Sequence, residues 1–365
     1  MEPTTPSNPT SSTTDGTSST VPGRIAGIDL ARCLAIFGMF AVHIGPTDAE
    51  GLVGWLYGLP HGRASLLFVL VAGIGVSLLA GSSRGSTIQA RTQLVWRAVL
   101  LLPLGLALQD LDHGAAVILQ DYGALFVVAA VVLSLPDRWL LGVVGLVLPI
   151  GSVVFLQGRL AAPEVFDRGV VAISDPAPEI VHGIILSGPY PLITWLAPFL
   201  FGLWLGRQDL RSAGVRSVLV LWGLAIAVTS WVASWVLEML LEVDGELIGW
   251  AYLVVDGPHR QMPLWVIGST AAATALLGAA LVLADAFPRA TRPLVQTGQL
   301  ALTVYVGHLL VLHSAPEAAT ADEIIRAIGI LGVFAIVALA FSSLWRRRFR
   351  RGPLELLLHL PWRRS

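Results

Sequence analysis

The chain has 365 residues, of which 55% are hydrophobic and only 13% are charged. Because a soluble domain carries about 25% charged residues, this composition excludes an ordinary soluble protein, and the mean hydropathy of +0.74 points to a polytopic membrane protein. The formal net charge of −1 decides little, since acids and bases fall in different loops. The single cysteine, Cys33, forms neither an intrachain disulfide nor a cysteine-based metal site.

The first 23 residues are rich in Ser, Thr and Pro and contain no apolar block. A segment of this kind cannot bury enough surface to fold, so residues 1–23 are predicted to be a disordered tail. The tail lacks the basic start and the short apolar core of a cleaved signal peptide. The first apolar segment is therefore expected to direct membrane insertion.

Ten apolar runs follow, each a candidate membrane-spanning helix: 25–45, 61–81, 94–109, 114–134, 138–156, 190–206, 216–237, 263–284, 294–313 and 324–345. We expect an all-α bundle of about ten transmembrane helices over residues 24–345. With the N-terminus inside, arginines gather in the inner loops and in the tail 346–365, whereas acids gather in the outer loops. This pattern predicts that both termini are cytoplasmic. The basic tail could form a short helix on the inner leaflet.

The first segment carries three ionisable residues, Asp29, Arg32 and His43, which a bilayer rarely tolerates unless they face a partner or a water-filled cavity. Arg32 and His43 are eleven residues apart, so they share a helix face at a separation of about 16 Å. His43 could act as a general base or could simply bond a neighbouring helix. Asp29 and Arg32 could form a structural ion pair or bind a ligand.

Further candidates lie at the outer ends of other segments. His61 and Arg63 lie at the outer end of the second segment, His259 lies in an outer loop before the eighth, and His308 lies inside the ninth. His61 and Arg63 would approach His43 if the first two helices form a hairpin, although Arg63 could also snorkel to the interface. Phosphate-binding loops and zinc motifs are missing from the sequence, and no metal site is expected.

Several stretches resemble the transmembrane acyltransferases, namely the acyltransferase-3 group and the related heparan-α-glucosaminide N-acetyltransferase group. Arg32, ten residues and His43 match the pattern of the first helix, and GIDLARCLAIFGMF is similar to an Asp-x-x-Arg-Gly opening, with Cys33 where Gly is usual. The resemblance continues through HGRASLLFVLVAGIGVSLLAG, SGPYPLITWLAPFLFGLWLGRQDL, GPHRQMPLWVIGS, PLVQTGQLALTVYVGHLLVLH and RRGPLELLLH, and so covers about residues 24 to 360.

The resemblance implies transfer of an acyl group, usually acetyl, from cytoplasmic acyl-CoA to an extracytoplasmic sugar, glycolipid or envelope acceptor, in a bacterial cytoplasmic membrane. It makes His43 the catalytic histidine and Arg32 its partner on the same helix, and we count Asp29 with them as a catalytic candidate. His61, Arg63, His259 and His308 belong to matching elements and are expected to bind substrate. Arg91 and Arg97, placed in an inner loop, are candidates for the CoA phosphates. No nucleic-acid partner is expected, and a homo-oligomer is left open.

Two other functions fit the same sequence. A transporter or flippase could use Asp29, Arg32 and His43 as a substrate or proton path. The sequence shows neither an internal repeat nor a clearly broken helix pair in support of transport. A non-catalytic partner in envelope assembly is the third hypothesis, and it predicts that substitution of His43 has no effect.

Overall fold

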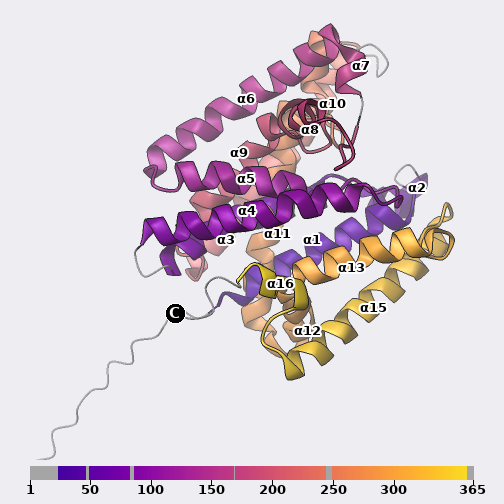
Figure 1. The fold of residues 1–365 in the computed structure, drawn as a ribbon. Helices are drawn as coiled ribbons and strands as arrows, with labels where there is room; N and C mark the ends of the chain where they lie inside the picture. The colour runs from indigo at the N-terminus through magenta and orange to yellow at the C-terminus, as the bar shows by residue number, and fades with distance from the viewer. Residues whose placement is uncertain (1–23, 47–48, 83–85, 168, 244–248, 360–365) are drawn as a thin grey trace, which may run out of the picture.

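The computed structural model describes residues 24–46, 49–82, 86–167, 169–243 and 249–359, so the tail predicted for residues 1–23 lies outside the described residues. All secondary structure in the described part of the chain is helical (Figure 1). The α-helices are α1 (Ala26–Ile44), α2 (Gly51–Gly58), α3 (Arg63–Ser82), α4 (Thr87–Gln109), α5 (Leu119–Val132), α6 (Asp137–Ala161), α7 (Pro163–Phe166), α8 (Ala177–His182), α9 (Leu192–Leu205), α10 (Ala213–Leu240), α11 (Pro263–Ala286), α12 (Pro288–Gln299), α13 (Ala301–Ser314), α14 (Pro316–Ala319), α15 (Ile324–Arg348) and α16 (Pro353–Leu357). A π-helix η1 (Gly183–Ser187) and a 3-10 helix η2 (Trp250–Val254) complete the set.

The chain is a polytopic helical membrane protein. Among the described residues, seven helical stretches are long and apolar enough to cross a bilayer, and two bent helix pairs raise that number to as many as nine. The seven are α1, α2 with α3, α4, α6, α10, α11 and α15. Helix α5 coincides with the predicted segment 114–134, but it has only 14 residues.

Helix α4 begins earlier than the predicted segment 94–109. The Ser86 hydroxyl accepts a hydrogen bond from the backbone N–H of Gln89 at 3.3 Å, which is the usual N-cap geometry, and the helix starts at Thr87. Its first turns carry polar side chains, so hydropathy alone did not include them in the predicted segment. The placement of Arg91 and Arg97 in an inner loop was therefore wrong, because both residues lie on α4.

Two helix pairs are broken, contrary to the expectation from the sequence. The chain from α8 through η1 bends by 58° before α9, and α12 meets α13 at 72°. The first break contains Pro189 and Pro191, which have no backbone N–H and cannot continue a helical ladder. Part of the predicted outer loop 157–189 is thus helical, in α7, α8 and η1.

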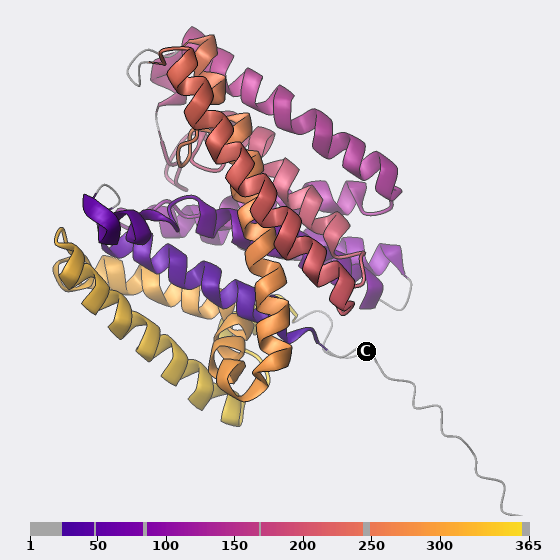
Figure 2. The same ribbon diagram turned by 180° about the vertical axis from the view of Figure 1, so that it is seen from behind.

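Helix α1 lies inside the bundle, where it packs against α3, α11, α12, α13 and α15 (Figures 1 and 2). Backbones approach closely at two of these contacts. A Cβ on Gly27 would collide with the backbone of Leu281, and a Cβ on Gly298 would collide with the backbone of Asp29. Helices α10 and α15 bury few of their residues instead. The ionisable residues of α1 therefore face protein, as a charge at membrane depth requires.

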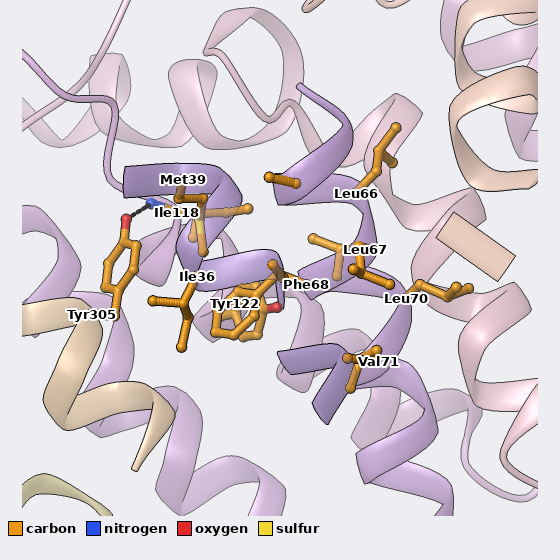
Figure 3. Packing of buried hydrophobic residues seen from close by; sticks show 14 of the residues in the cluster. Ile36, Met39, Leu66, Leu67, Phe68, Leu70, Val71, Ile118, Tyr122 and Tyr305 are labelled. Carbon is orange, nitrogen blue, oxygen red and sulfur yellow. Dashed lines mark hydrogen bonds between the residues drawn. The ribbon is translucent and has the colours of Figure 1, made fainter. Parts of the chain in front are cut away.

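Side chains from four helices fill the space beside α1. Ile36 and Met39 of α1 pack near Phe68 of α3, Tyr122 of α5 and Tyr305 of α13 (Figure 3). The Tyr305 hydroxyl accepts a hydrogen bond from the backbone N–H of Ile118 at 3.3 Å, which ties α13 to the start of α5 (Figure 3). This contact fixes the turn of α13 that carries His308.

The predicted tail helix is present as α16, and it docks on the bundle. The Glu355 carboxylate accepts hydrogen bonds from the Thr303 backbone N–H at 3.1 Å and the Thr303 hydroxyl at 2.6 Å. Thr303 lies in the first turn of α13, where a carboxylate satisfies free N–H groups and the helix dipole. On the other side, the Trp96 indole donates to the Leu357 carbonyl at 3.0 Å.

Candidate active site

His43, near the C-terminal end of α1, is bonded to His308 of α13. Its Nδ1 lies 3.0 Å from Nε2 of His308, the ring planes differ by 6°, and the ring centroids are 5.3 Å apart. Rings stacked face to face would be closer, so these values describe two nearly coplanar rings joined edge to edge by an N–H···N bond. His308 is 3% exposed and packs between Phe40 and Tyr305.

The partners of His308 fix which nitrogen of each ring carries a proton. Nδ1 of His308 lies against the backbone carbonyl of Tyr305, and because a carbonyl only accepts, that nitrogen carries the hydrogen. In a neutral His308, Nε2 is then an acceptor, so His43 donates from its Nδ1. The second nitrogen of His43, Nε2, keeps its lone pair. Among the described residues, none donates a hydrogen bond to it.

The other outer candidates converge on this pair. His61 and His259 lie with ring centroids 5.6 Å apart, and both are within electrostatic range of His43. His113, a loop histidine that was not among the predicted site residues, is also within range and is 8% exposed. Five segments distant in sequence thus place imidazoles around one region of the bundle.

A strained loop positions His259. His259 and Gln261 have φ angles of 57° and 64°, a region that costs free energy for residues other than glycine. Gln261 is completely buried, and its amide oxygen accepts from the Thr194 hydroxyl at 2.9 Å and the Trp195 indole at 2.8 Å. Its amide nitrogen donates to the Pro189 carbonyl at 3.0 Å. These bonds hold the loop in a conformation that it would not adopt alone.

The ring of His259 lies among aromatic side chains. Its centroid is 5.4 Å from that of Tyr190 and 6.1 Å from those of Trp195 and Trp265. Nδ1 of His259 donates to the Pro189 carbonyl at 3.1 Å, since a carbonyl cannot donate. Tyr190 lies in the break before α9 and Trp195 lies in the first turn of α9, so this broken helix supplies one wall of the region.

Burial lowers the pKa of His259 from 6.5 to about 4, although the bond to Pro189 opposes this shift, and repulsion from His61 adds to it. The unfolded chain binds a proton near pH 6.5, so the neutral ring stabilises the folded state above that pH. This contribution is lost as pH falls from 6.5 through about 4. We expect the unfolding midpoint of the wild type to fall more over this interval than that of His259→Gln, measured by differential scanning fluorimetry in detergent. Parallel curves would contradict the assignment.

Arg63 pairs with an acid that the sequence did not single out. Its guanidinium lies 4.0 Å from the Asp256 carboxylate and also donates to the Leu59 carbonyl at 3.4 Å. The side chains of Arg63 and Asp256 are 31% and 12% exposed. The Arg63 charge is also felt by His61, so this arginine belongs to the histidine region and is partly neutralised there.

The inner end of α1 holds a separate charged cluster. Asp29 is 1% exposed and accepts from Arg32 at 2.8 Å, from Arg24 at 2.9 Å and from Gln299 of α12 at 3.3 Å. The ion pair between Asp29 and Arg32 anticipated from the sequence therefore forms. Arg32 does not meet His43, because ten residues of α1 lie between them.

The two arginines predicted to hold CoA phosphates have different surroundings. Arg97 lies within electrostatic range of Arg32. The buried Nε of Arg97 and that of Arg91 both lack a hydrogen-bond partner among the described residues. Arg91 instead donates to the Ser134 hydroxyl at 3.2 Å. The structure thus joins Arg97, but not Arg91, to the cluster at the inner end of α1.

The structure also reveals a buried acid that sequence reasoning missed. Asp121 of α5 is 6% exposed and lies within electrostatic range of Tyr190 and Tyr305. An aspartate inside the apolar run 114–134 was a signal for it, because such residues mark functional sites by default. The sequence contains no comparable signal for Gln261. Within the described residues, no group of three or more His, Cys, Asp or Glu side chains is placed to hold a metal ion.

Comparison with known proteins adds one family. Residues 204–364 match a family described as "Protein of unknown function (DUF418)". The matched region contains His259 and His308 and leaves out His43. No curated protein matches the chain.

Proposed function

We propose that the protein is a membrane-bound acyltransferase that moves an acyl group, acetyl first among the candidates, from cytoplasmic acyl-CoA to an extracytoplasmic hydroxyl or amine. The observation that carries this proposal is the bonding of His43. Its Nδ1 donates to His308, which leaves the lone pair of Nε2 for an incoming proton. A neutral imidazole oriented by a second group is the arrangement that general-base catalysis needs.

The proposed reaction has one bond-forming and one bond-breaking step. Nε2 of His43 takes the proton of the acceptor hydroxyl or amine as its oxygen or nitrogen bonds to the thioester carbon. The carbon–sulfur bond then breaks, and the His43 imidazolium returns the proton to the leaving thiolate. Arg63 and His61 lie in the same region and could donate to the oxyanion. Direct attack by His43 would instead give an acyl-histidine and ping-pong kinetics.

The donor would approach from the inner end of α1. Arg97 lies within electrostatic range of Arg32 there, and the Arg32 side chain is 24% exposed. Their charges suit the CoA phosphates, since arginine binds phosphate through paired N–H donors. The pantetheine arm would then run about 16 Å along α1 to bring the thioester to His43. Arg91, held by Ser134, is the weaker candidate.

The proposed topology is ten crossings with both termini in the cytoplasm of a bacterium. It requires that both bent pairs and the short helix α5 each cross once, in addition to the seven long stretches. The positive-inside pattern supports this arrangement. The acceptor, a sugar, glycolipid or other envelope molecule, would reach His43 from the outer side.

A transporter is the second candidate, and the two bent helix pairs favour it. Transporters bind substrates at broken helices, where free backbone groups point at the ligand. Here those groups have internal partners. The first turn of α13 is bonded to Glu355, and the Pro189 carbonyl accepts from His259 and Gln261. The hydrogen bonds at these breaks therefore contribute to the structure of the candidate site, and they are weaker evidence for an ion path.

Binding and transfer of a labelled acyl group separate the two candidates. We expect the purified protein in lipid nanodiscs to bind acetyl-CoA with micromolar affinity and to pass the label to an acceptor. Arg97→Gln is expected to weaken binding about tenfold, the effect of losing one charged hydrogen bond, whereas the exposed inner-face variant Arg138→Gln is not. Absence of binding to acetyl-CoA and longer acyl-CoAs, together with movement of unmodified substrate across vesicles, would favour transport.

A further inference from the structure

A polar groove lies between the amphipathic helix α12 and the end of α15. It has a volume of about 360 Å³ and is lined by Arg289, Arg292, Pro293, Gln296, Ser343 and Arg347. The four residues from α12 are spaced i, i+3, i+4 and i+7, and the two from α15 are spaced i, i+4. One face of α12 therefore forms one wall of the groove, and one face of α15 forms the other. A hollow of this size falls in the usual range for small-ligand sites, about 300–1,000 Å³.

The groove concentrates positive charge without a carboxylate to balance it. Among the described residues, Arg289, Arg292 and Arg347 have no acidic partner. Asp285, the nearest acid before α12, binds Arg216 at 2.7 Å instead. Three guanidinium groups beside an amide and a hydroxyl form a donor-rich site, which suits an anion with several acceptor oxygens.

The position of the groove determines which anions can reach it. Three residues after Gln296, α12 bonds to Asp29 through Gln299, so the groove lies at the arginine-rich end of α1 and away from His43. The positive-inside pattern places this end at the cytoplasmic surface. Phosphate esters are the anions common there, as anionic lipid headgroups in the leaflet and as soluble nucleotides and cofactors.

We propose that the groove is a binding site for a phosphate ester at the cytoplasmic face. The Arg289, Arg292 and Arg347 side chains bind the phosphate oxygens, and Gln296 and Ser343 add neutral hydrogen bonds. This site is distinct from the histidine region and from the cluster of Arg32 and Arg97. Its binding is measured without turnover, so its failure and the failure of the proposed acyl transfer are separate results.

The test compares two variants that remove the same charge. The groove variant is Arg289→Gln, Arg292→Gln and Arg347→Gln together. The control, Arg138→Gln, Arg348→Gln and Arg350→Gln, removes three exposed inner-face arginines that do not line the groove. In one arm, native mass spectrometry counts phosphatidylglycerol retained from nanodiscs that also contain phosphatidylcholine. In the other, calorimetry in phosphatidylcholine nanodiscs measures binding of inorganic pyrophosphate.

We expect the groove variant to bind at least about tenfold more weakly than the control in one arm, since each arginine near the surface adds to the attraction of an anionic phosphate. Loss of retained phosphatidylglycerol identifies the ligand as a lipid headgroup, and loss of pyrophosphate binding identifies a soluble phosphate. Equal binding by the two variants in both arms would overturn the proposal and leave only a general positive surface. The single variant Arg292→Gln serves if the triple variant does not fold.

Discussion

Replacement of His43 by alanine is expected to lower the rate of acyl transfer about 10²- to 10⁴-fold, the usual contribution of a general base. The variant should still bind acetyl-CoA, because the arginines proposed to hold the CoA phosphates lie at the other end of α1. It should also fold, since His43 is only partly buried and forms one side-chain hydrogen bond among the described residues. Single-turnover release of CoA in nanodiscs, with binding measured in parallel, tests this expectation.

A control separates loss of the base from loss of any histidine. His182 lies on α8 and bonds Ser187 at 2.9 Å, outside the histidine region, so His182→Ala should transfer at the wild-type rate. An unchanged rate in His43→Ala would remove His43 from the mechanism. Mass spectrometry of the wild-type protein after incubation with acetyl-CoA alone would show whether a covalent acyl-histidine forms.

Replacement of His308 should slow transfer through its effect on His43. In His308→Phe the acceptor for the His43 Nδ1–H is gone, so the ring no longer holds one tautomer and orientation. We expect a loss on the order of 100-fold, smaller than the roughly 10⁴-fold loss that a wrong imidazole tautomer causes in serine proteases. His308→Gln, whose amide oxygen can accept the same hydrogen, should recover a substantial part of the rate.

Two measurements distinguish positioning from simple packing. The loss in His308→Phe should appear in kcat rather than in KM, because His308 acts on His43 and not on the donor. Nitrogen NMR of the His43 ring should show a single tautomer in the wild type and in His308→Gln, and a mixture in His308→Phe. The control is His313→Phe on the same helix, an exposed histidine whose Nδ1 bonds the Asp112 carbonyl at 3.0 Å. Equal losses in His308→Phe and His308→Gln would contradict the tautomer argument.

Much of the fold follows from local sequence. Nine of the ten apolar runs overlap a single helix, because a long apolar segment satisfies its backbone in a bilayer by forming a helix. The run 294–313 instead covers the end of α12, the bend and most of α13. The ion pair of Asp29 and Arg32 was also predictable, since residues three apart are neighbours on any helix. The features that were not predicted are also local. The polar start of α4 and the bends before α9 and α13 left no mark in hydropathy.

For the candidate site, the histidines could be picked out from the sequence, because ionisable residues in apolar segments are costly enough to be conspicuous. His43 and His308 are two such residues. That they meet is a property of the packing of α1 against α13, because their contact joins residues 265 positions apart. The same packing turns the Tyr305 carbonyl toward His308 and so selects the tautomer of His43. No periodicity along the chain encodes that choice, since it depends on the direction of a hydrogen bond between two helices.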